Sequence, residues 1–133
     1  MISQRHSTSG FTLIELLIVV VIIGVLAAIA IPKFANTKDK AMLATMKADL
    51  RNLATAQEGY LYDNHTYYTG AVPGAGLEFQ PSTGVSITVS DVSAGGWAGV
   101  AQHANVPGST CALFIGAAGA VAPAVDEGQI RCN

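Results

Sequence analysis

The residue in most need of a chemical explanation is Glu15, a carboxylate within the most apolar stretch of the chain. The segment from Phe11 to Ile31 contains no other charged side chain. As a helix, this segment would span about 30 Å, the hydrocarbon thickness of a bilayer. An unpartnered carboxylate inside a bilayer costs about 2.5 to 3.5 kcal/mol. Glu15 therefore either lies near the headgroups, at the positive end of the helix dipole, or pairs with a cation.

The remaining polar residues are not spaced as catalytic or metal-binding groups usually are. His6, His65 and His103 lie far apart, and the sequence contains no zinc-binding motif or nucleophile motif. The adjacent carboxylates Asp126 and Glu127 precede a glycine, which is more typical of a solvated turn than of calcium ligands. We therefore expect no enzyme activity, no metal site and no cofactor.

The composition favours one folded domain with a modest core. Of the 133 residues, 50% are hydrophobic and 12% are charged, which is too apolar for a disordered chain. The formal net charge is −2, and the lysines form no run beyond the loose trio Lys33, Lys38 and Lys40. No direct nucleic-acid site is evident from this charge distribution.

The two cysteines, Cys111 and Cys132, both lie in the C-terminal quarter of the chain. In an oxidising compartment they would form a disulfide, and in a reducing one they would remain free thiols. A bridge would close a loop of about 21 residues and would stabilise the fold by about 3 kcal/mol.

Downstream of the apolar segment, residues 33 to 62 are predicted to form the amphipathic half of the same helix. Apolar or neutral positions recur at steps of three and four, which define one face of an α-helix. Most charged residues are expected on the other side, and the helix is expected to end near Asp63-Asn64. The two sets are Leu43, Met46, Leu50, Leu53, Gln57 and Tyr60, against Lys38, Lys40, Lys47, Asp49 and Arg51.

Residues 63 to 133 are predicted to form a small antiparallel sheet, because short apolar runs alternate with turn signals. One face of this sheet must be buried, and the amphipathic half of the helix is the available partner. The fold class is therefore α+β. The predicted strands are Val85 to Val89, Trp97 to Gln102 and Cys111 to Ile115. The aromatic residues expected to pack at the helix-to-sheet junction are Tyr60, Tyr62, Tyr67, Tyr68, Phe79 and Trp97.

The stretch from Gly10 to Glu15, GFTLIE, followed by an unbroken apolar run, resembles the class III leader of type IV pilins and pseudopilins. The close resemblance covers residues 4 to about 36. It implies the pilin fold, with a protruding apolar first half of the helix. It also implies that a prepilin peptidase cuts between Gly10 and Phe11 and that the new Phe11 amine is N-methylated. Glu15 would pair with the Phe11 ammonium of a neighbouring subunit and so take part in assembly.

The resemblance also assigns roles to Gly24, Pro32 and the two cysteines. Pro32 lacks an N–H and crowds the carbonyl four residues before it, so a kink is expected there. In many pilins the stretch between such a glycine and proline loses helical order in the filament. A C-terminal disulfide in that family bounds a loop that is often exposed and variable, and here the bridge between Cys111 and Cys132 would bound such a loop.

These expectations divide the chain into a cleaved leader (1–10), a transmembrane and filament-core helix (11–32), the amphipathic helix half (33–62) and a β head with a C-terminal disulfide loop (63–133). The expected function is that of the structural major subunit of a type IV pilus. The subunit would be held in the inner membrane with its head outside, and would then enter an extracellular filament for adhesion or motility. Expected partners are its own copies, the lipid bilayer, the peptidase, and the assembly platform with its ATPase.

Two alternatives remain open. One is a pseudopilin of a type II secretion or DNA-uptake system, which would use the same apolar helix in a shorter fibre. The other is a single-pass anchored binding protein that never polymerises.

Overall fold

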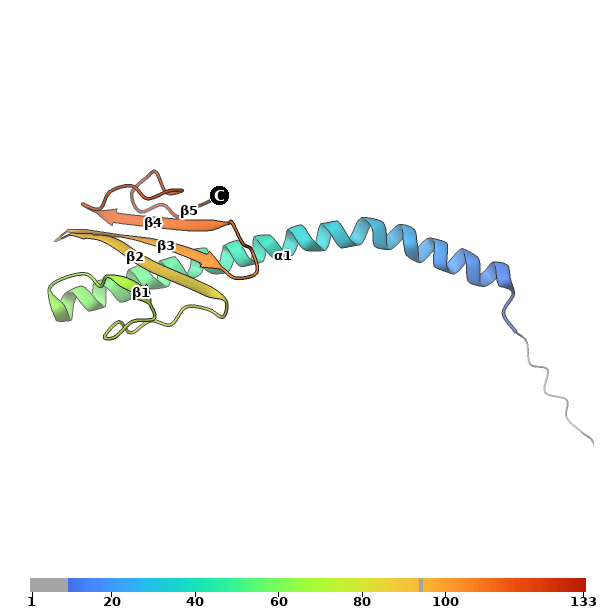
Figure 1. The fold of residues 1–133 in the computed structure, drawn as a ribbon, viewed down its shortest axis with the longest axis horizontal. Coiled ribbons are helices and arrows are strands. Elements are labelled where there is room, and N and C mark those ends of the chain that lie inside the picture. The colour runs from blue at the N-terminus through green and yellow to red at the C-terminus, as the bar shows by residue number, and fades with distance from the viewer. Residues whose placement is uncertain (1–9, 94) are drawn as a thin grey trace, which may run out of the picture. The chain divides into compact units, whose positions relative to one another are not determined.

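The computed structural model describes residues 10–93 and 95–133, so the predicted leader lies outside it except for Gly10. The described residues form one long helix and one five-stranded antiparallel sheet, which confirms the α+β prediction (Figure 1). The elements are α1 (Leu13–Asn64), β1 (Gly70–Val72), β2 (Val85–Ser93), β3 (Gly96–His103), β4 (Thr110–Gly116) and β5 (Arg131–Cys132). The chain divides after Thr37 into two units, called here the apolar unit and the head (Lys38–Asn133).

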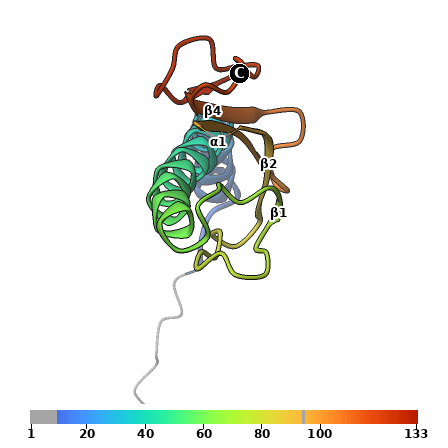
Figure 2. The same cartoon turned by 90° about the vertical axis from the view of Figure 1, so that its left-hand side faces the viewer.

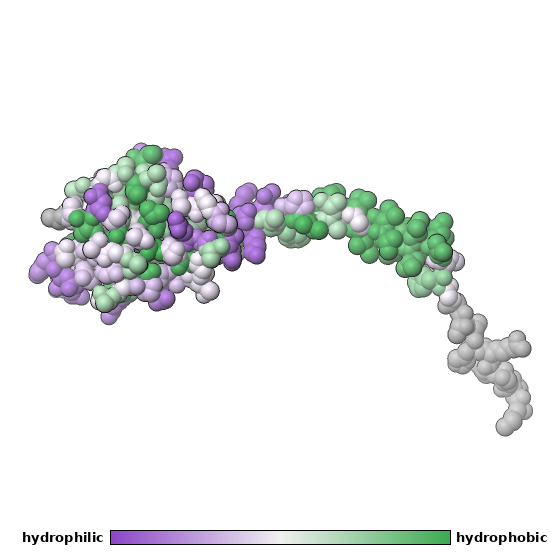
Figure 3. All heavy atoms as spheres, viewed as in Figure 1, coloured by the Kyte–Doolittle hydropathy of each residue, from purple (hydrophilic) through white to green (hydrophobic). Residues whose placement is uncertain are grey.

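The apolar unit consists mainly of the first turns of α1. Its large side chains are exposed, and the side of it seen in Figure 3 is almost entirely apolar. The helix containing it is long and apolar enough to cross a membrane. The backbone stays helical across Pro32. A helix that is apolar around most of its circumference is normally buried in protein or in lipid, because it has no face suited to water.

Within the head, α1 lies along one face of the sheet, as the end-on view in Figure 2 shows. The predicted buried face is confirmed, because Met46, Leu50 and Leu53 are fully buried and their neighbours Leu43 and Tyr60 are partly buried. The helix ends at Asn64, where the sequence predicted its end.

The sheet is a meander in which each strand pairs with the next one in the sequence. All three predicted strands are present and are longer than expected, with Val85 opposite His103 in the β2–β3 pair and Trp97 opposite Ile115 in the β3–β4 pair. The sequence did not predict β1 and β5. These strands have only 3 and 2 residues, and pairing with a neighbour defines them rather than any run of strand-forming residues.

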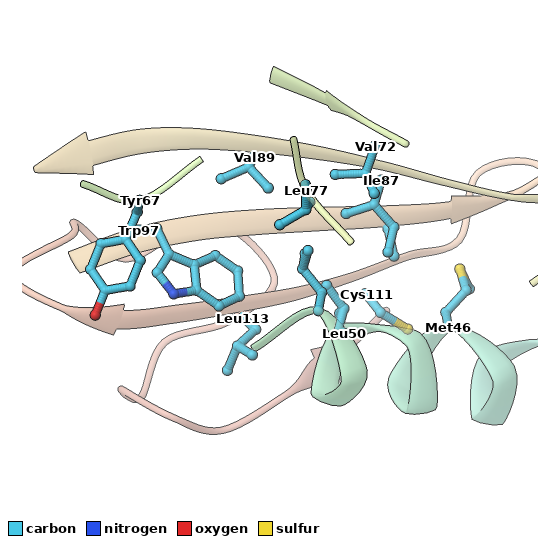
Figure 4. Close-up of a cluster of buried hydrophobic side chains, with 12 residues drawn as sticks. Met46, Leu50, Tyr67, Val72, Leu77, Ile87, Val89, Trp97, Cys111 and Leu113 are labelled. Atoms are coloured by element: carbon cyan, nitrogen blue, oxygen red, sulfur yellow. The ribbon is translucent and has the colours of Figure 1, made fainter. Parts of the chain in front are cut away.

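The main core lies between the sheet and α1 and contains the fully buried Trp97 (Figure 4). Gly99 allows this close packing, because a Cβ there would lie 2.9 Å from the Trp97 ring and 3.6 Å from both Leu50 and Leu53. The other buried members of this core are Tyr67, Val72, Leu77, Ile87, Val89, Ala101, Cys111 and Leu113.

A second, smaller core covers the opposite face of the sheet at β3 and β4. There the segment between β4 and β5, residues 117 to 130, folds back over Ala98 and Phe114. Ala118 and Ala124 from this segment are 7% and 1% exposed. The disulfide loop is therefore not simply an exposed surface loop, because part of it seals the outer face of the sheet.

Two predictions about individual side chains were wrong. Asp49 was expected on the charged side of the helix, but it is only 3% exposed, and both its carboxylate oxygens accept hydrogen bonds at 2.9 Å from the backbone N–H and hydroxyl of Ser82. It follows Met46 by three residues and so shares the buried face. Tyr62 was expected to pack at the helix-to-sheet junction, but it is 84% exposed.

Gln57 joins the end of the helix to the segment that leads into β1. Its amide nitrogen donates to the Tyr68 carbonyl at 3.0 Å, and its amide oxygen accepts from the Tyr68 N–H at 2.8 Å. The side chain is fully buried. A glutamine is required here because both backbone groups would otherwise lack a partner.

We predict that Gln57→Leu lowers the free energy of unfolding of the head by about 2 to 4 kcal/mol, since it leaves two backbone groups unsatisfied. Urea unfolding of the full chain in detergent would measure this loss through the fluorescence of Trp97, the only tryptophan in the sequence. The control Asn52→Leu, at an exposed position of the same helix, should change stability by less than about 0.5 kcal/mol. Equal losses in the two variants would contradict this role of Gln57.

Candidate functional site

The bond between Gly10 and Phe11 lies in non-helical backbone just before α1, which begins at Leu13. Phe11 is 89% exposed, and a Cβ added at Gly10 would meet no atom within 4 Å. Exposed backbone outside regular structure is where proteases cut most readily. The backbone at Gly10 and Phe11 is therefore accessible to a peptidase.

Glu15 forms a capping box with Thr12 at the start of α1. The Thr12 hydroxyl accepts from the Glu15 N–H at 3.3 Å, and one Glu15 oxygen, Oε2, accepts from the Thr12 N–H and hydroxyl at 2.8 Å each. This reciprocal arrangement satisfies two backbone donors that have no partner within the helix. Thr12 was not predicted from the sequence to have a role, although the spacing Thr-x-x-Glu before an apolar run is the pattern that signals such a cap.

The capping box leaves half of the Glu15 carboxylate available. The second oxygen, Oε1, forms no hydrogen bond within residues 10–93 and 95–133, and the side chain is exposed. A carboxylate oxygen can accept more than one hydrogen bond, so Glu15 can maintain the cap and still receive a donor from another molecule. The two sequence-based interpretations, helix terminus and intermolecular pair, are therefore compatible.

Gly24 and Pro32 both lie on the exposed part of α1. A Cβ at Gly24 would meet nothing within 4 Å outside the helix backbone, so packing within this chain does not require a glycine there. Pro32 lies inside the helix and has no N–H to donate to the carbonyl of Ala28. Both residues lower helix stability, by about 1 and 3 kcal/mol. The segment they bound is thus the weakest part of the apolar helix by residue type, and its kinking or melting stays a prediction.

The disulfide predicted between Cys111 and Cys132 is present in the structure, with a sequence separation of 21. It joins residues that face each other directly in the β4–β5 pair, and Cys111 is fully buried. Asn133 adds a second link, because its side-chain oxygen accepts from the Thr110 N–H at 2.7 Å. The C-terminal segment is therefore held to β4 by a covalent bond and by hydrogen bonds.

The carboxylates Asp126 and Glu127 are both exposed, as expected of a solvated turn, and each also has a structural partner. Asp126 forms an ion pair with Arg131 at 2.6 Å, and Glu127 accepts from the Gly116 N–H at 2.7 Å. The hydrogen bond of Glu127 holds the disulfide loop against β4, and the ion pair of Asp126 joins the same loop to β5. Among the residues that the structure describes, no three histidine, cysteine or acidic side chains gather as they would around a metal.

One other ionisable pair connects the helix to the loop after it. The Tyr67 hydroxyl donates to the Glu58 carboxylate at 3.2 Å. Burial raises the pKa of the Tyr67 phenol above its usual value, and the negative charge of Glu58 adds to the rise. Tyr67 therefore stays neutral throughout the physiological range and acts as a structural donor.

Comparison with known proteins connects these features to one family. The family model described as the prokaryotic N-terminal methylation motif matches residues 5–31. The type IV wide pilus major component PilA4 of Thermus thermophilus is 35% identical over 102 residues, which cover 75% of this chain and 77% of that protein. This chain therefore belongs to the type IV pilin and pseudopilin family, as the GFTLIE motif indicated.

Relatives of both kinds, pilins and secretion proteins, are similar to the chain. The type II secretion system core protein G of Pseudomonas aeruginosa is 44% identical over 64 residues, 48% of this chain and 45% of that protein. The type IV major pilin protein PilA of Myxococcus xanthus is 48% identical over 58 residues, 44% of this chain and 26% of that protein. The chain thus spans less than half the length of several of the relatives it matches.

We predict that reduction of the disulfide lowers the free energy of unfolding of the head by about 3 kcal/mol, because the open chain regains loop entropy in the unfolded state. Urea unfolding of the full chain with and without dithiothreitol, followed by Trp97 fluorescence, measures the difference. The double variant Cys111→Ala, Cys132→Ala should not respond to the reductant. An unchanged midpoint for the unsubstituted chain after complete reduction would contradict the prediction.

Proposed function

We propose that this chain is the structural major subunit of a type IV pilus. The observation that carries the proposal is the helix from Leu13 to Thr37, whose large apolar side chains are exposed on every side. Such a surface needs a non-aqueous environment at every stage. The bilayer provides it first, and the same helices of neighbouring copies provide it after assembly. The role is structural and involves no catalysis by this chain.

Processing would precede assembly. A prepilin peptidase cuts after Gly10 and methylates the amine of Phe11. Both residues of this bond are exposed, which supports the step. Residues 1 to 10 are then a cleaved leader, residues 11 to 32 the membrane and filament-core segment, residues 33 to 62 the amphipathic half, and residues 63 to 133 the head. The subunit waits in the inner membrane with its head outside. An assembly platform with its ATPase then moves it into the extracellular filament.

Within the filament, Glu15 would pair with the Phe11 ammonium of a neighbouring copy. The pair neutralises two charges that the apolar surroundings would otherwise leave unsatisfied, and it sets the register of the copies. The free Oε1 oxygen of Glu15 supports this role, since the cap occupies only Oε2. Loss of helical order between Gly24 and Pro32 would accompany packing of the copies.

The second candidate function is that of a pseudopilin in a type II secretion or DNA-uptake system, which the matches to core protein G support. One observation favours the pilus. The match to the Thermus thermophilus pilus component extends over 102 residues, against 64 for the Pseudomonas aeruginosa core protein G. A third candidate, an anchored binding protein that does not polymerise, leaves the leader motif unexplained.

The experiment that tests the proposal is isolation of filaments sheared from the surface of the bacterium that makes this protein. We predict that this chain is their main component, that it begins at Phe11 with one added methyl group, and that Cys111 and Cys132 are joined by a disulfide. Sheared filaments without this chain would favour the pseudopilin. A membrane-bound chain that retains residues 1–10 would favour the anchored binding protein.

We predict that Glu15→Gln abolishes assembly while the subunit is still processed and inserted in the membrane. Glutamine can accept the hydrogen bond from the Thr12 N–H and so keeps the cap, but it removes the charge that pairs with an ammonium. The measurements are the yield of sheared filaments and the mass of the membrane-bound subunit.

The matched control is Thr12→Ala, which loses the side-chain half of the cap and keeps the charge. It should assemble, with a helix start weakened by about 1 kcal/mol. Normal filaments from Glu15→Gln, or loss of filaments from Thr12→Ala alone, would show that the charge of Glu15 is not the assembly determinant.

A further inference from the structure

The head carries a groove that its own side chains do not fill. It has a volume of about 460 Å³ and lies between α1 and the segment that follows β4. Its apolar lining is Ala54 from the helix, Leu113 and Ile115 from β4, and Ile130 from the disulfide loop. All but Leu113 of these are only partly buried, so apolar surface remains open to solvent.

A single cation borders this groove. Arg51 lines it from α1 and is exposed, and within the described residues its guanidinium forms no ion pair, since the only one found there joins Arg131 to Asp126. An apolar surface beside a free guanidinium fits a ligand that presents an apolar group next to a carboxylate.

The same head displays such a ligand at the end of α1. Tyr62 is 84% exposed, and Asp63, also exposed, follows it directly. Nothing in the packing of the head explains an aromatic ring left in water at this position. Tyrosine and arginine are the residue types most enriched at the centres of protein interfaces.

We propose that the Tyr62-Asp63 pair of one copy docks into the Arg51 groove of another copy. The ring of Tyr62 covers the apolar lining, and the carboxylate of Asp63 pairs with the guanidinium of Arg51. This contact rests on the proposed function, because it joins the heads of two copies within the filament.

The geometry favours an open assembly. Two copies with parallel helices cannot form this contact in both directions at once, because Arg51 and Asp63 lie apart along the helix axis. Between parallel copies the contact is therefore heterologous, and each copy keeps its groove or its Tyr62-Asp63 pair for the next copy. Arg51 and Asp63 are separated by about 18 Å along the helix axis. Parallel copies joined in this way are therefore staggered along their helices, as growth of a filament requires.

A crosslinking experiment on intact filaments tests the contact. A photoreactive phenylalanine analogue replaces Tyr62, and the filaments are illuminated and then dissociated. We expect a ladder of covalent oligomers, with crosslinks in the peptides that contain Arg51 or Gln129-Ile130 of another copy. The control places the analogue at Ala104, an exposed position in the turn between β3 and β4, and should not label those peptides.

Charge exchange gives a second, independent readout. Asp63→Arg and Arg51→Asp should each lower the yield of sheared filaments at least about tenfold, and the double variant should restore it. Combining Arg51→Asp with Asp39→Arg, at an exposed carboxylate outside the contact, should not restore it. Both residues are exposed, so an unchanged unfolding midpoint by Trp97 fluorescence confirms that the head still folds.

Three results would overturn the contact. Crosslinks from position 62 to other peptides or to a different protein would assign Tyr62 another partner. Crosslinked dimers without larger species would indicate a closed pair of copies. Normal filaments from both single charge variants would show that the ion pair is not needed. These outcomes differ from failure of the proposed function. In that case the unsubstituted chain itself forms no filament, and the proposed contact is also wrong.

Discussion

The structure depends above all on an apolar helix surface that has no stable place in water. The apolar unit of α1 is covered by aliphatic side chains on all sides, and its only carboxylate lies in the first turn. The hydrophobic effect therefore requires that this unit always be surrounded by lipid or by protein. The proposed transfer of this unit from lipid to neighbouring copies would meet that requirement at both stages.

The capping box refines the role of Glu15. A carboxylate in an apolar segment suggests a single partner, but here one oxygen holds the start of the helix through Thr12 while the other remains available. One oxygen is thus engaged within the chain, and the other is available to a donor from another molecule, as the proposed pairing with an ammonium requires.

In the head, both faces of the sheet are covered at β3 and β4 within a short chain. The helix covers one face through Met46, Leu50 and Leu53, and the disulfide loop covers the other through Ala118 and Ala124. The bridge between Cys111 and Cys132, with the ion pair of Asp126 and Arg131, holds that loop in place. Small alanines suffice there because the loop backbone lies close to the sheet.

The features that arise from local periodicity and from one dense motif could be predicted from the amino-acid sequence. These are the apolar helix, its buried face from Met46 to Gln57, the three longer strands and the segment from Gly10 to Glu15. The folded structure was needed to show that Asp49 is buried against Ser82, that Tyr62 is exposed, and that β1 and β5 exist. Each of these depends on which segment packs beside the residue. Contacts between residues distant in sequence, such as those 33 positions apart, leave no periodic signal in the chain.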